Sequence, residues 1–178
     1  MRPFKNFILA AGTLAGSMLF ASTTNAQTPK LSDAEIASVA VTANKIDVDY
    51  AAIAQKKSKD AGILRFAKTM ADDHNATIAA ATKLVTKLKV TPKDNSLSQS
   101  LNADAMKTKK MLNEKTGKTF DKAYIDNEVA YHKAVIGAVE TILIPQAKNV
   151  ELKSLLESVM PVLRTHLEHA EMLQKSYK

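Results

Sequence analysis

The chain has 178 residues, a formal net charge of +7, and neither cysteine nor tryptophan. Without cysteine it can form no disulfide and no lipid link through a leading cysteine, so its stability must come from a packed core. Only three of its 25 basic residues are arginines, the usual bidentate readers of phosphates and bases, and aromatic residues make up 5%, so no nucleic-acid partner is predicted.

The first 26 residues have the pattern of a secretory signal peptide. Arg2 and Lys5 form a basic head, the apolar run 7–21 follows, and small residues at Thr24 and Ala26 suit a cleavage site. We therefore expect cleavage after Ala26, which leaves residues 27–178 as one periplasmic or secreted domain. This domain contains no apolar run long enough for a membrane helix, so no transmembrane segment is predicted in it.

The charge of the domain bears on its partners. Without Arg2 and Lys5 it has 23 basic and 18 acidic residues, a net charge of +5. Such a lysine-rich surface favours weak attraction to anionic components of the cell envelope. The sequence does not indicate an oligomeric state.

Apolar residues at helical spacing predict three helices in the first two thirds of the chain. The first, about 33–58, follows a capping box of Ser32 and Glu35, and Asp47 lies on its inward face. The second, about 61–89, ends before a proline and carries His74 within an apolar stripe. The third, about 97–115, is shorter and more polar, and we expect Gly117 to stop it.

Two long helices follow. Thr119 is the expected N-cap of a helix over about 120–144, in which Glu128 and His132 lie one turn apart on the inward face and can touch. Pro145 should end or kink that helix. The last helix, about 149–176, has His166 inward and His169 near its polar boundary, and the proline at 161 predicts a kink or break ahead of His166.

Four long amphipathic helices and one short connecting helix predict an all-α four-helix bundle, most simply packed up-down-up-down. In such a bundle the inward polar residues would meet in the interior. These candidate metal ligands are Asp47, His74, Glu128, His132 and His166. Imidazoles and carboxylates from several helices suit a divalent transition metal, namely Zn, Fe, Mn or Cu. No other cofactor is predicted.

Two other readings remain open. The same residues could form a metal-free buried hydrogen-bond network that fixes the packing of the bundle, which would leave the protein a structural or interaction module of the cell envelope. An enzyme is less favoured, because the chain has no cysteine nucleophile, no Gly-x-Ser-x-Gly turn and no phosphate-binding glycine loop. A metal-assisted hydrolase would also need a pocket and an open coordination position.

Three motifs resemble the domain-of-unknown-function 4142 family. They are Phe66-Ala67-x-x-Met70-x-x-Asp73-His74, Phe120-Asp121-x-x-Tyr124-Ile125 with His132 two turns on, and Met160-Pro161-x-Leu163-x-x-His166-Leu167-x-x-Ala170. The resemblance covers nearly all of residues 27–178. It implies an exported bacterial protein with a ferritin-like fold, of the kind often labelled outer membrane proteins, and it implies no established activity.

The chain departs from the di-iron proteins of the wider ferritin-like group. Those proteins carry a Glu-x-x-His pair on each of two helices. Here the residues three positions before the candidate histidines are Ala71, Val129 and Leu163. The sequence therefore predicts a mononuclear metal site or none, rather than iron storage.

Overall fold

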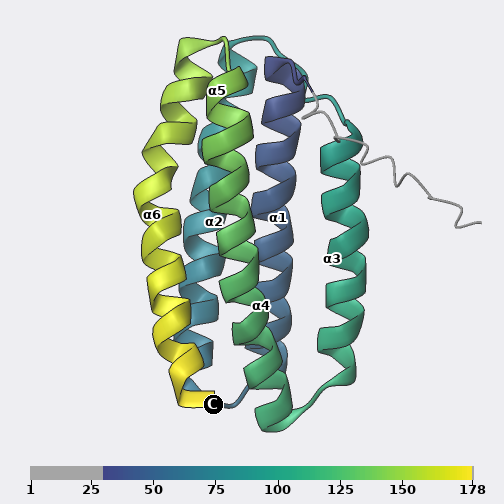
Figure 1. Ribbon diagram of the computed structural model, residues 1–178, viewed down its shortest axis with the longest axis vertical. Helices are drawn as coiled ribbons and strands as arrows, with labels where there is room; N and C mark the ends of the chain where they lie inside the picture. Colours follow the sequence, from purple (N-terminus) through teal and green to yellow (C-terminus); the bar gives the residue numbers. More distant parts are fainter. Residues whose placement is uncertain (1–29, 178) are drawn as a thin grey trace, which may run out of the picture.

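A computed structural model describes residues 30–177, and nearly all of them are helical (Figure 1). The long helices are α1 (Asp33–Lys57), α2 (Ala61–Lys87), α3 (Ser96–Glu114), α4 (Gly117–Ala138) and α6 (Val150–Gln174). Three short elements complete the set, the π-helix η1 (Val139–Leu143), α5 (Ile144–Gln146) and the 3₁₀-helix η2 (Lys175–Tyr177). No strand occurs between residues 30 and 177, so the all-α prediction is confirmed. The predicted signal peptide, residues 1–26, lies outside the described residues.

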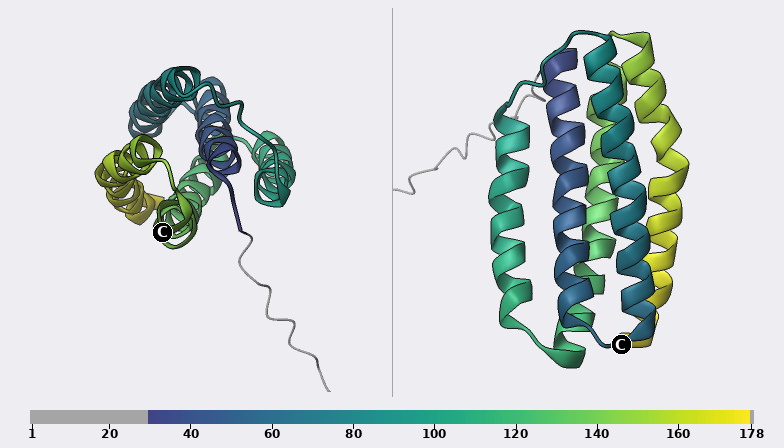
Figure 2. Two further views of the ribbon diagram at one scale, coloured as in Figure 1. Left: turned by 90° about the horizontal axis from the view of Figure 1, so that it is seen from above. Right: turned by 180° about the vertical axis from the view of Figure 1, so that it is seen from behind.

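Four of the long helices, α1, α2, α4 and α6, surround one interior, and α3 lies outside them beside α1 (Figure 2). The helices α1 and α6 run from top to bottom in Figure 1, whereas α2 and α4 run from bottom to top. The expected up-down-up-down order is therefore wrong, because α3 carries the chain back to the lower end before α4 begins. Neighbouring helices around the interior are still antiparallel. In the part of the chain that the structure describes, no helix is long and apolar enough to cross a membrane.

Polar side chains cap the first three helices. The predicted capping box is present, since the Ser32 hydroxyl accepts from the backbone N–H of Glu35 and the Glu35 carboxylate accepts from that of Ser32. Asp60 caps α2 by accepting from two backbone N–H groups, at 2.7 and 3.0 Å. Asn95 caps α3 in the same way. Such caps typically contribute about 1 kcal/mol each, and they place the helix starts that set which residues face inward.

The junction between α3 and α4 differs from the sequence prediction. Helix α3 ends at Glu114, and Gly117 is the first residue of α4 rather than the stop of α3. Thr116 is the N-cap residue, and Thr119 lies inside the helix, where its hydroxyl donates to the Thr116 carbonyl at 2.7 Å. The φ of Gly117 is +54°, a backbone conformation that glycine adopts at little cost. The glycine therefore serves the tight reversal that starts α4.

The two prolines have different effects. Ahead of Pro145 the helix widens into η1, in which the Ile144 N–H donates to the Val139 carbonyl five residues back. By contrast, α6 is continuous from Val150 to Gln174, so the break predicted at Pro161 is wrong and His166 belongs to the same helix. Pro161 and Glu157 are both exposed, and the Glu157 carbonyl that the proline leaves without a partner can therefore meet water.

The apolar core has two parts. The lower part is built around the rings of Phe66, Phe120 and Tyr124, and the upper part is aliphatic, with Ile36 and Leu156 among its members. The polar residues predicted to face inward lie at the level between these two parts. The fold therefore surrounds them with apolar side chains on both sides.

Candidate metal centre

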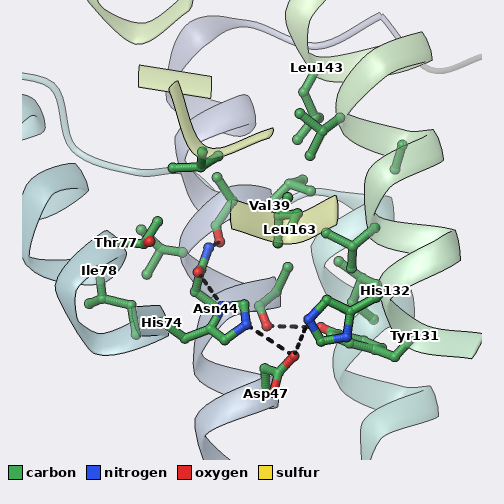
Figure 3. Close-up of a pocket in the computed structure, with 18 of the residues that line it drawn as sticks. Val39, Asn44, Asp47, His74, Thr77, Ile78, Tyr131, His132, Leu143 and Leu163 are labelled. Carbon is green, nitrogen blue, oxygen red and sulfur yellow. Dashed lines mark hydrogen bonds and ion pairs between the residues drawn. The ribbon is translucent and has the colours of Figure 1, made fainter. Parts of the chain in front are cut away.

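The structure brings all five candidate metal ligands together. Asp47 comes from α1, His74 from α2, Glu128 and His132 from α4, and His166 from α6. Their exposed fractions run from 0% for the two carboxylates to 4% for His74, so all are buried. The three imidazole rings lie 5.3 to 5.7 Å apart between centroids. Figure 3 shows His74 and His132 pointing toward Asp47 from opposite sides. We call these five residues the histidine cluster.

The tautomer of His74 follows from its contact with Asn44, a residue that the sequence analysis missed. The Asn44 Nδ2 donates to the Ala40 carbonyl at 2.8 Å, so its Oδ1 is the atom that faces His74. This oxygen can only accept, and it lies 2.7 Å from His74 Nδ1, which therefore carries the hydrogen. The lone pair of Nε2 then points toward Asp47 Oδ2, 3.3 Å away. Asn44 lies three residues before Asp47 on α1, and this helical spacing is the signal that could have identified it.

His132 is oriented by the backbone of its own helix. Its Nδ1 lies 3.0 Å from the backbone carbonyl of Glu128, which accepts and cannot donate. Nδ1 therefore carries the hydrogen, and the lone pair of Nε2 lies 3.6 Å from Asp47 Oδ2. The side chain of Glu128 also approaches His132, with Oε2 3.6 Å from Nδ1. The predicted contact between these two residues is present.

His166 is held through its Nε2, whereas His74 and His132 are held through Nδ1. Its Nε2 donates to Asp73 Oδ2 at 2.8 Å, which leaves the lone pair on Nδ1. In the sequence Asp73 directly precedes His74, but in the structure its side chain lies against His166. Adjacent helical residues point about 100° apart, so Asp73 faces α6 while His74 faces the interior. His169, expected to be exposed, is half-buried with its ring 5.2 Å from that of Phe66, outside the cluster.

Burial keeps the three histidines neutral. It lowers the pKa of His74 to about 3 and that of His132 to about 4, and it also lowers the pKa of His166. In each ring, one nitrogen donates to an oxygen acceptor and the other is a buried atom without a hydrogen-bond partner in the described part of the chain. Neutral imidazoles whose outer N–H is held by a carboxylate, an amide or a backbone carbonyl are typical of metal ligands.

The two carboxyl groups lack partners as well. Both side-chain oxygens of Asp47 and both of Glu128 are buried without a hydrogen bond to any residue from 30 to 177. Burial raises the pKa of Asp47 to about 8 and raises that of Glu128 well above its ordinary value. An unpartnered buried polar group typically costs about 1–3 kcal/mol. Seven such atoms in one cluster therefore need either protons or a cation.

The distances within the cluster suit a metal ion. Two groups, His74 with His132 and His166, and Asp47 with Glu128 and His132, each offer ligand atoms that lie within 4.8 Å of one another. A tetrahedral ion with bonds of about 2.1 Å separates its ligands by roughly 3.4 Å. The separations of Asp47 Oδ2 from the nearest imidazole nitrogens, 3.3 and 3.6 Å, are close to that value.

A cavity of about 450 Å³ adjoins the cluster, and its lining includes Asp47 and all three histidines. Small-molecule sites typically have about 300–1,000 Å³. The arrangement can therefore bind a cation and place it beside a space that a small molecule could occupy.

Comparison with protein families gives one match. The model of a domain of unknown function, DUF4142, matches residues 20–173 and so includes the whole histidine cluster. Neither the curated proteins nor the solved structures give a match. The resemblance found in the three sequence motifs is confirmed, and the chain belongs to the DUF4142 family.

Proposed function

We propose that this protein is an exported metal-binding protein that holds one divalent transition metal inside its helical bundle. The proposed ligands are Nε2 of His74, Nε2 of His132, Nδ1 of His166 and an Asp47 oxygen, with Glu128 as a second carboxylate close by. Three imidazoles and one carboxylate suit Zn or Cu best among Zn, Fe, Mn and Cu, because nitrogen-rich sets favour these two ions.

One observation carries the proposal. Each histidine donates one ring hydrogen to an oxygen that is not a proposed ligand atom, and each thereby directs the lone pair of its other nitrogen inward. The three acceptors come from different sources, a side-chain amide, a backbone carbonyl and the Asp73 carboxylate. Three independent contacts with the same outcome are what a metal site requires, since its ligands must be deprotonated and oriented before the ion binds.

A metal-free network, the alternative function, fits these contacts less well. If Asp47 were protonated, its hydroxyl could donate to one imidazole only, and the two available distances of 3.3 and 3.6 Å exceed those of O–H donors. In such a network the nearby nitrogen donors for the Glu128 carboxyl in the described chain are the Asn127 side chain and, at 3.6 Å, the Nδ1 of His132, and neither is within ordinary hydrogen-bond geometry. A structural or interaction module of the cell envelope is therefore the second candidate.

The proposal includes a ferritin-like fold and export. The fold is supported by α3, which acts as one long crossover and makes α2 and α4 run in the same direction, as in ferritin-like bundles. The residues three positions before the histidines are not glutamates, which favours a mononuclear centre. Export is supported by the signal-peptide pattern of residues 1–26.

Zinc titration of chelator-treated protein tests the metal centre. Added Zn should raise the melting temperature, because a ligand that binds only the folded state stabilises that state. At a free Zn concentration about 100 times the dissociation constant, the stabilisation is about 2.7 kcal/mol. His132→Ala should abolish the increase. His169→Ala, which changes a histidine of the neighbouring helix outside the cluster, should preserve it.

The metal-free alternative gives a different result in the same titration. If Zn and Cu leave the melting temperature unchanged at neutral pH, or if the two alanine variants respond alike, the cluster is a hydrogen-bond network. Element analysis of protein purified from its native compartment provides an independent check, with one equivalent of metal expected per chain.

A further inference from the structure

The cavity beside the histidine cluster is polar at one end only. In Figure 3, His74, His132 and Asp47 lie at the lower end, and Leu143 lies at the upper end with Val39 and Leu163 between. The wall beyond the cluster is mainly aliphatic, with leucine, valine, isoleucine and alanine from all five long helices and η1. No histidine other than the three of the cluster lines it in the described chain.

Small side chains create the space. Ala37 and Ala43 of α1 and Ala81 of α2 are buried and line the cavity, at inward positions where bundle helices usually carry larger residues. The apolar atoms that line a cavity of this size have no protein neighbours on one side. An apolar ligand that fills the space would provide the missing contacts.

The cavity meets the surface at more than one place. Val162 of α6 lines it and is 41% exposed. Asp104 of α3 and Ala130 and Ala134 of α4 also line it and are exposed. The cavity is therefore open to a ligand from outside.

We propose that the cavity binds a molecule with one unbranched aliphatic chain and a single carboxylate head, with the head at the metal and the chain extended toward Leu143. The aliphatic side chains of the wall select the chain. The carboxylate is selected by the metal, which would take one of its oxygens as a fifth ligand beside the three imidazoles and Asp47, since a cation in an apolar site attracts an anionic oxygen ligand. The inference rests on the proposed metal centre, because without a cation the head would face the carboxyl group of Asp47.

Binding of dodecanoate to the zinc-loaded protein, followed by titration calorimetry, tests this inference. Dodecanoate should bind, and acetate should bind at least about 100-fold more weakly, because it has the same head but no methylene groups to bury. Ala81→Leu should fill the cavity and weaken dodecanoate binding about tenfold or more. Ala80→Leu makes the same change at the adjacent exposed position of α2 and should leave binding unchanged.

The zinc content of every preparation separates the two proposals. If zinc is retained but dodecanoate does not bind, or binds no more tightly than acetate, the chain site is absent and the metal centre stands. Equal binding of dodecanoate to both leucine variants, with zinc retained, also overturns the chain site. If no preparation retains zinc, the metal centre and the carboxylate site both fail.

Discussion

Asp47 has a central place in the histidine cluster, because its Oδ2 lies within 3.6 Å of two imidazole nitrogens that belong to different helices. It is fully buried, and both of its oxygens lack a hydrogen-bond partner within residues 30–177. In the metal-free protein this environment favours the protonated acid, and a bound cation would favour the carboxylate. The same residue therefore links stability, pH and metal binding.

The pH dependence of the metal-free protein should reveal this linkage. The pKa of Asp47 is about 8 in the folded state, compared with a reference value of 3.8. Between these two pH values, the folded protein therefore keeps a proton on Asp47 that the unfolded chain has lost. The contribution of Asp47 to the free energy of unfolding is fully present below pH 3.8 and is lost as the pH rises toward 8. His74 acts in the opposite direction, since its pKa falls from 6.5 to about 3, but its effect ends above pH 6.5.

We therefore expect the free energy of unfolding of chelator-treated protein to fall between pH 6.5 and about 8. Asp47→Asn should reduce the fall, because asparagine has no proton to lose, and adding Glu128→Gln should remove most of the remainder. Asp49→Asn changes an exposed residue of the same helix and serves as the control. Urea unfolding at several pH values measures how steeply the free energy of unfolding changes with pH. An equal change for Asp47→Asn and for the wild type would contradict the raised pKa of Asp47.

At the scale of the helices, residue spacing predicted which side chains face inward, and packing determined the rest. Helical periodicity placed His74, His132 and His166 in the interior because the period of 3.6 residues sets one face of each helix. The contact between Asp73 and His166 depends on how α2 lies against α6, which no local pattern specifies. The cavity was also missed, because inward alanines such as Ala81 have the same pattern as a filled core.

The two parts of the core should respond differently to truncation. Leu112 of α3 is fully buried within the lower, closely packed part, whereas Leu163 of α6 faces the cavity and already lacks neighbours on one side. Leu→Ala in a core typically costs about 2–5 kcal/mol, and more where the surroundings are well packed. Leu112→Ala should therefore lie near the upper end of that range and Leu163→Ala near the lower end.

Urea unfolding of the two variants measures these costs, provided that their m-values equal that of the wild type. Leu155→Ala, at a half-buried position of α6, gives a reference for an incompletely buried leucine. A larger loss for Leu163→Ala than for Leu112→Ala would show that the region around Leu163 is closely packed, and that the cavity is filled by side chains in solution.

At the scale of the whole molecule, the surface has an excess of lysine, and ion pairs link some of its helices. Ion pairs connect α3 to α1 through Lys109 and Asp49, and α4 to α6 through Lys133 and Glu171. Exposed pairs of this kind contribute about 0–1 kcal/mol each, so they add little to the stability that the core provides. The net charge of +5 over residues 27–178 has its main effect on association with other charged surfaces.

We expect a protein of residues 27–178 to bind weakly to vesicles that contain an anionic lipid, and the binding should depend strongly on salt. At about 0.01 M salt the Debye length is ~30 Å, so many surface lysines act together, whereas at about 1 M it is ~3 Å and their attraction is screened. Co-sedimentation at the two salt concentrations measures the effect, and vesicles of neutral lipid are the matched control. Binding that persists at about 1 M salt, or that is equally strong on neutral vesicles, would assign the attachment to an apolar surface and not to the lysines.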